Sequence, residues 1–186
     1  MTTTDSVVDL IADPDLQSLM DEIVSEHSGA DVEPDPRAVW DTLVEVGLAR
    51  LTGPEADGGS GAGWTEAAAL LRTFAAAGVA VPYAETDLLA GPLRRAAELD
   101  DTSQATATVA VLGADGSAHR VPWAGATESV VCVRRTPQGY EIADVPTADL
   151  DVHPTPAVSA VPTGSITPPP RRRGLAWPAR RSRSTS

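Results

Sequence analysis

Apolar residues recur at helical spacing through the first half of the chain. The first stripe follows Asp13 and Pro14, residue types that favour the N-cap and the first position of a helix. Its members stand at i, i+3, i+4, i+7 and i+8. They are Leu16, Leu19, Met20, Ile23 and Val24. This spacing predicts a helix with one buried face.

Three further helices are expected in the same half. The second runs from near Pro36 to Gly47, since glycine suits the left-handed residue that follows a helix. Its apolar face comprises Val39, Trp40, Leu43 and Val44. A third helix is expected over Thr65–Ala77. A fourth is expected over Ala84–Glu98, where Pro92 either bends the helix or divides it in two.

Near Gln104 the pattern changes to alternation, which predicts strands. A hairpin is expected from Ala105–Leu112 and Ala118–Val121, joined at the turn signal Asp115-Gly116. Further strands are expected at Ser129–Arg135, Tyr140–Val145 and Asp151–His153, with a turn at Pro137-Gln138-Gly139. The order predicts an α+β chain. A helical bundle domain would cover residues 1–100 and a partial antiparallel β domain residues 104–166.

The last segment, residues 167–186, differs in composition and charge. All 26 acidic residues but only eight arginines precede residue 167, so that part carries a net charge of −18, and the other six arginines follow it. The segment is rich in Arg, Pro and Ser and has no helical or strand period, which predicts a disordered tail. One hypothesis is a shift of reading frame in a GC-rich gene that shortened a longer protein.

Composition narrows the class of protein. No apolar run is long enough to span a membrane, and the N-terminus lacks the features of a secretory signal. The single cysteine, Cys132, excludes an internal disulfide framework, so a cytoplasmic location is expected. The acidic body opposes binding to nucleic acid and to anionic lipid.

The glycine-rich stretch Gly58–Gly63 invites a comparison with phosphate-binding loops. A P-loop requires a lysine, and the chain contains none. A dinucleotide fingerprint requires a preceding strand and a final glycine, where Glu66 stands instead. We therefore interpret this stretch as a flexible connection between helices.

Other candidate residues favour structural roles. The three histidines (His27, His119 and His153) lack partners at metal-ligand spacing. Asp31, Glu33 and Asp35 alternate as in a calcium loop, but the turn glycine is missing, so a solvated acidic loop is expected. Cys132 lies in an apolar strand, which indicates a buried, unreactive thiol.

The order of the central motifs resembles the N-terminal helical domain of the flavin-dependent acyl-CoA dehydrogenases. The resemblance lies in Gly47-Leu48-Ala49, Pro54-Glu55, Gly58-Gly59-Ser60-Gly61, the helix Thr65–Ala77 and the segment from Pro82 to Gly91. Residues 121–131 are similar to a reduced form of the family's β domain. The resemblance covers about residues 35–155, so the bundle and the β domain are expected to be those of this family.

The family resemblance implies a reaction. Its members use FAD to dehydrogenate acyl-CoA thioesters at the α,β carbons, with a glutamate base in a C-terminal helical domain. That domain and the family's flavin-contacting loops have no counterpart here, so no catalytic or cofactor-binding residue is carried over. We expect no activity from this chain alone, and partners that are acyl-CoA dehydrogenase subunits in a homo- or hetero-oligomer.

The helix from Ala84 is the best candidate for a substrate contact. In the family the corresponding helix walls the acyl-chain pocket, and Thr86, Leu89 and Leu93 fall on one face at α-helical spacing. Plain helix–helix packing explains the same spacing. Tyr83 could line the same pocket or cap the turn.

Two other functions remain open from the sequence. The chain could be a non-catalytic partner subunit of a heteromeric acyl-CoA dehydrogenase. It could alternatively bind nucleic acid through Arg171–Arg183 with Trp177 for stacking, although the acidic body opposes this. Unpaired strand edges of a partial β domain also predict marginal stability.

Overall fold

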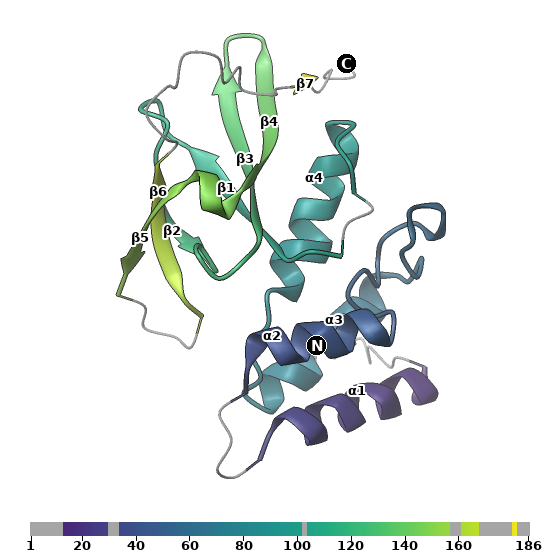
Figure 1. Ribbon diagram of the computed structural model, residues 1–186. Coiled ribbons are helices and arrows are strands. Elements are labelled where there is room, and N and C mark those ends of the chain that lie inside the picture. The colour runs from purple at the N-terminus through teal and green to yellow at the C-terminus, as the bar shows by residue number, and fades with distance from the viewer. Residues whose placement is uncertain (1–12, 30–33, 102–103, 157–160, 168–179, 182–186) are drawn as a thin grey trace, which may run out of the picture.

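The computed structural model describes residues 13–29, 34–101, 104–156, 161–167 and 180–181. Helices occupy one end of the molecule and two β-sheets the other, with α4 lying beside the first sheet (Figure 1). The α+β class and the order of helices before strands are therefore confirmed.

The helices begin where local chemistry sets them. Helix α1 (Pro14–His27) starts at Asp13, whose carboxylate accepts the N–H of Asp15 at 2.9 Å. Helix α2 (Pro36–Glu45) starts in the same way at Asp35. The residue two beyond its end, Gly47, has a φ of +79°, as predicted for a left-handed C′ position.

Four further helical pieces complete this half. A short 3₁₀ turn (Glu55–Asp57) precedes α3 (Trp64–Ala76), which lies one residue before its predicted range. The expected fourth helix is a π-helix, η2 (Ala84–Ala90), followed directly by α4 (Gly91–Ala96). The winding changes from π-helical to α-helical directly before Pro92. This proline occupies the first turn of α4, where a missing N–H is tolerated.

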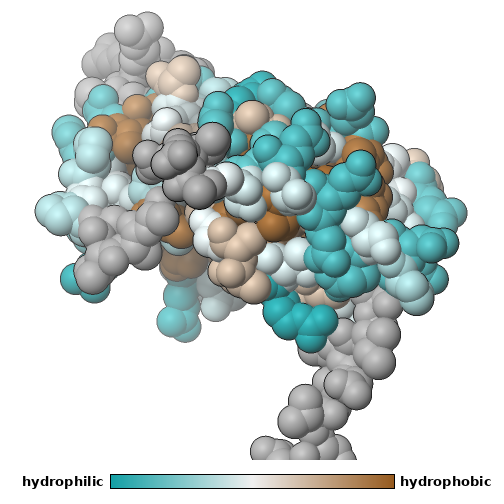
Figure 2. Space-filling view, turned by 90° about the horizontal axis from the view of Figure 1, so that it is seen from below, coloured by the Kyte–Doolittle hydropathy of each residue, from teal (hydrophilic) through white to brown (hydrophobic). Residues whose placement is uncertain are grey.

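The helical core gathers around α1, α2 and α3. Its fully buried side chains include Met20, Trp40, Leu43, Leu70 and Tyr83. Figure 2 views the molecule from the helical end, where apolar side chains appear in separate brown patches among polar ones. The predicted apolar stripes of α1 and α2 therefore form one core.

The strands form two sheets. The first has the order β1-β3-β4-β7, from β1 (Ala107–Leu112), β3 (Ser129–Thr136), β4 (Gly139–Pro146) and β7 (Arg180–Arg181). The second has the order β2-β6-β5, from β2 (Ala118–Pro122), β6 (Thr163–Thr167) and β5 (Asp151–Thr155). All pairs are antiparallel except β1 with β3, which is parallel.

The predicted hairpin of residues 105–121 is wrong, whereas the β3–β4 hairpin is confirmed. The turn at Asp115-Gly116 does form, because the Gly113 N–H bonds the Ser117 carbonyl at 2.8 Å. Beyond it, Arg120 has a φ of +54° at an irregularity in the β2–β6 ladder. Strand β2 pairs with β6 on both sides of this irregularity, so it belongs to the second sheet and does not return along β1. The predicted disorder of the tail lies outside the described residues, except at 180–181, which form β7.

Two further apolar clusters fill the β half. One lies between the sheets and includes Leu112, Val121, Val130, Cys132 and Ile166. The other lies between the first sheet and the η2–α4 helix, where Ala90, Ala97, Ala107, Val131 and Ile142 are buried. The second cluster attaches the β part to the helical part.

Candidate functional site

The three predicted substrate contacts lie in different environments. Thr86 is 5% exposed, Leu89 is 51% exposed, and Leu93 is half-buried against the cluster beside the sheet. The expected common face does not form, because η2 has π-helical winding, which the α-helical spacing of the prediction does not fit. Of the three, Leu89 is the side chain open to an external molecule.

Thr86 joins the helix to the sheet. Its hydroxyl donates to the Ala107 carbonyl, and the Ala107 N–H donates back to the same oxygen, both at 3.0 Å. Both residues are buried. Thr86 therefore fixes the start of β1 against η2, a structural contact that the sequence pattern did not indicate.

Two adjacent arginines at the end of α4 extend this joint. Arg94 is 3% exposed, and its Nε donates to Asp144 Oδ2 on β4 at 2.8 Å while its Nη2 donates to Ser129 Oγ on β3 at 2.8 Å. Arg95 instead binds Asp101, which also accepts from Arg50 at 3.0 Å. We name this set of side chains (Arg50, Arg94, Arg95, Asp101, Asp144 and Ser129) the polar joint.

A neighbouring carboxylate is equally occupied. Asp87 Oδ2 accepts the Thr52 N–H at 2.9 Å, the Thr52 hydroxyl at 3.0 Å and the Tyr83 hydroxyl at 3.0 Å. Burial, reinforced by the charge of Asp87, raises the pKa of Tyr83, so the phenol remains a neutral donor. Tyr83 therefore anchors η2 and does not line an open pocket.

These contacts decide what the buried acids can do. Asp87 and Asp101 each hold two or more donors, and Asp144 holds Arg94. In the described part of the chain, these three carboxylates therefore anchor neighbouring side chains.

Glu85 and Trp123 form a second contact between the halves. Burial raises the pKa of the Glu85 carboxyl, and hydrogen bonds from its own backbone and from the Trp123 side chain partly oppose that rise. Trp123 is 2% exposed and has a φ of +59°, which is unusual for a bulky residue. No sequence signal marked either residue.

The glycine-rich stretch is closely bonded rather than a flexible connection. The Gly59, Gly61 and Ala62 N–H groups donate to the carbonyls of Pro54, Gly53 and Leu51 at 2.9 Å each. The Arg50 guanidinium binds the Asp57 carbonyl. With their N–H groups occupied by the chain's own carbonyls, these residues do not form a phosphate cradle.

The remaining sequence candidates have ordinary structural roles. Asp35 caps α2, while Asp31 and Glu33 lie outside the described residues. Cys132 is buried, and burial raises its pKa to about 12, as expected for an unreactive thiol. His27 bonds Thr42, His119 bonds Ser165, and His153 is exposed on β5. Among described residues, no set of three His, Cys, Asp or Glu side chains could hold a metal.

Residues 15–102 match the sequence model of the acyl-CoA dehydrogenase N-terminal domain. This range covers α1 to α4 and ends at the polar joint. The helical part of the chain matches the acyl-CoA dehydrogenase family. A search of the curated proteins found no match. None of the helices in the described ranges has the length and apolar character needed to cross a bilayer.

Solved acyl-CoA dehydrogenase structures share the fold across both halves. The ChsE4-ChsE5 complex from Mycobacterium tuberculosis matches with a TM-score of 0.69 and 19% identity over 86% of this chain and 55% of that one. A variant of the Tcur3481-Tcur3483 steroid ACAD matches with a TM-score of 0.65 and 22% identity, over 83% of this chain and 54% of that one. Glutaryl-CoA dehydrogenase from Mycobacterium smegmatis matches with a TM-score of 0.68 and 13% identity, over 86% of this chain and 54% of that one. The chain thus spans little more than half the length of these structures.

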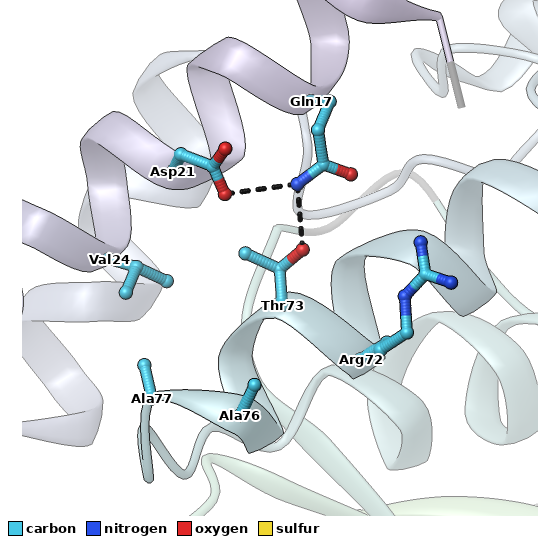
Figure 3. A pocket seen from close by; sticks show the side chains of 7 residues that line it. All are labelled: Gln17, Asp21, Val24, Arg72, Thr73, Ala76 and Ala77. Carbon is cyan, nitrogen blue, oxygen red and sulfur yellow. Dashed lines mark hydrogen bonds between the residues drawn. The ribbon is translucent and has the colours of Figure 1, made fainter. Parts of the chain in front are cut away.

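The described residues do not by themselves fit the family's FAD. The hollow at the polar joint has a volume of about 10 Å³, room for one water molecule. A larger hollow of about 520 Å³ lies between α1 and α3, away from the sheets. Figure 3 shows Gln17 spanning it through bonds to Asp21 and Thr73, each at 3.0 Å. Neither hollow brings the helical and β parts together around a space for a flavin ring.

Proposed function

We propose that this chain forms part of an FAD-dependent acyl-CoA dehydrogenase and that dehydrogenation of the acyl-CoA thioester requires further polypeptide. The observation that carries the proposal is the fold match, which continues from the helices through the polar joint into the β part over 86% of the chain. A chance likeness of a helical bundle would not extend across the joint.

The small hollow at the joint supports the requirement for further polypeptide. About 10 Å³ is far below the several hundred Å³ of ordinary cofactor pockets. Apolar side chains remain exposed around the first sheet and η2, namely Leu89, Val111 and Tyr140. We propose that additional protein and the acyl group cover this side, with Leu89 as the contact from η2.

A second candidate is a non-catalytic subunit that supports a catalytic partner. Two of the matched structures, ChsE4-ChsE5 and Tcur3481-Tcur3483, are named as pairs of chains. The bonds that hold Asp87 Oδ2 and Asp101 Oδ2 in place also support this role, because they give both carboxylates a structural function. In this case the partner would supply the base and most of the FAD contacts.

The test is co-purification with the chains encoded by neighbouring genes, taking first any that are acyl-CoA dehydrogenase-like. Each preparation is assayed for acyl-CoA-dependent reduction of an electron-acceptor dye, with a panel of acyl-chain lengths. We expect turnover from a co-purified complex and none from the chain alone. Leu89→Trp should change the preferred acyl length in that complex. Val46→Trp, at another exposed apolar position just beyond α2, serves as the matched control. A chain that never joins such a complex would contradict the proposal.

A further inference from the structure

Arg94 is a charged residue at a buried position, where an apolar side chain is usually found. It lies beside the cluster of Ala90, Ala97, Val131 and Ile142, between α4 and the first sheet, and is 3% exposed. A buried ion pair is weak evidence for stability, because apolar residues of similar volume often replace such a pair without loss. The contribution of a guanidinium is geometric, since it bonds only in fixed directions.

The geometry of Arg94 restricts the sheet in two directions. One arm reaches Asp144 on β4 and the other Ser129 on β3, both at 2.8 Å. Two bonds from one planar group to two adjacent strands fix both the tilt and the rotation of α4 on the sheet. The Arg94 carbonyl meanwhile accepts the Leu99 N–H at 2.9 Å and closes the same helix.

The partner carboxylate depends on this arginine. The other oxygen of Asp144, Oδ1, is buried and has no hydrogen-bond partner among the described residues. Arg95, the next residue, binds Asp101 and through it Arg50 in the helical part. Arg94 is therefore the end of the polar joint that reaches the β part.

We propose that Arg94 is a positioning residue, which sets the orientation of the β part on the helical part and thereby aligns the flavin site of the assembled enzyme. The claim that Arg94 aligns the flavin site rests on the proposed acyl-CoA dehydrogenase function. The claim that Arg94 sets the orientation of the β part concerns this chain alone. A misplacement of about 1 Å can lower an enzymatic rate on the order of a hundredfold.

The orientation is measured on the full chain by distances between spin labels. The two spin labels are attached to cysteines introduced at exposed positions, Glu22→Cys on α1 and Gln138→Cys in the β3–β4 turn. The native Cys132 is buried, so we expect it not to react with the label. The key variant is the double substitution Arg94→Leu with Asp144→Leu, which leaves no unpaired charge. Arg135→Leu, an exposed arginine on β3, is the matched control.

We expect the double variant to unfold at a denaturant concentration no lower than the parent but with a broader distance distribution. In the co-purified complex its turnover should fall about a hundredfold with little change in KM. Arg94→Lys, which cannot fork to both strands, should recover only part of the loss. Ser129→Ala removes one arm without burying a charge, so it keeps the test valid if the double variant fails to fold.

A double variant with the parent's narrow distances and turnover would overturn the inference. A parent complex without flavin or turnover would contradict the proposed function instead. The distances in the isolated chain would then still decide whether Arg94 sets the orientation.

Discussion

Arg94 and Arg95 are adjacent in α4, yet their guanidinium groups bind carboxylates in different parts of the chain. Arg94 binds Asp144 in the sheet, and Arg95 binds Asp101, which Arg50 of the helical part also holds. One turn of helix thus connects the two halves through charged side chains. The apolar cluster beside α4 provides the buried contact area between the halves, and the directional bonds of the arginines orient the helix on the sheet.

Asp101→Asn should strongly destabilise the fold. The carboxylate is 7% exposed and neutralises two arginines, one of them equally buried. Its loss leaves buried positive charge without a partner, which typically costs about 3–5 kcal/mol. Denaturant unfolding measures the change. Asp41→Asn, which breaks the exposed pair with Arg37, should have little effect, because solvent screens the two charges. Equal effects of the two substitutions would contradict the importance of the joint.

Thr86→Val should destabilise the chain although it keeps the shape of the side chain. The valine neither donates to the Ala107 carbonyl nor accepts from its N–H, and a buried group left unpaired costs about 1–3 kcal/mol. Thr86→Ser keeps the hydroxyl and is the matched control. Unfolding free energies of the two variants should differ by about that amount, and identical values would show that the contact is dispensable.

The sequence predicted what local chemistry decides. The cap at Asp13, the left-handed Gly47 and the β3–β4 hairpin all follow from residues close in sequence. The cap at Asp35 was not predicted, because that residue was interpreted as part of an acidic loop. It did not predict that β1 pairs with β3, because the strands of a parallel pair are chosen by distant contacts.

The candidate site was predicted less well for a related reason. The π-helical winding of η2 separates Thr86 from Leu89, and no residue pattern marks such winding. The partners of Arg94 and Arg95 lie 50 and six residues away along the chain. Charged residues on a predicted helix are usually solvated, so their burial here could not be read from spacing.

Gly59→Ala should destabilise the glycine-rich loop. A Cβ at Gly59 would lie 2.2 Å from the Gly53 carbonyl oxygen, a backbone atom that cannot move aside without breaking the loop. Overpacking of this kind costs about 1–3 kcal/mol. Gly53→Ala, whose Cβ would meet its nearest atoms at 3.4 Å, is the control. Thermal melting should separate the two variants, and a Gly59→Ala chain as stable as the parent would mean that the loop is loose.

Glu85 should make the stability of the chain depend on pH. Burial raises the pKa of its carboxyl in the folded state. The folded chain therefore holds this proton more tightly, and the stabilisation, complete below the unfolded pKa, is lost as pH rises through the folded pKa. Glu85→Gln should lose less stability than the parent between acidic and neutral pH. The exposed Glu26→Gln is the control, and parallel pH profiles for Glu85→Gln and the parent would refute this role of burial.

The flavin absorbance spectrum tests most directly whether this chain needs further polypeptide to hold the cofactor of its family. It is recorded for the purified chain alone and for the chain purified with the chains encoded by neighbouring genes, each after incubation with FAD and removal of the excess. We predict no retained flavin in the first sample and retained flavin in the second. Stoichiometric flavin on the chain alone would contradict the account.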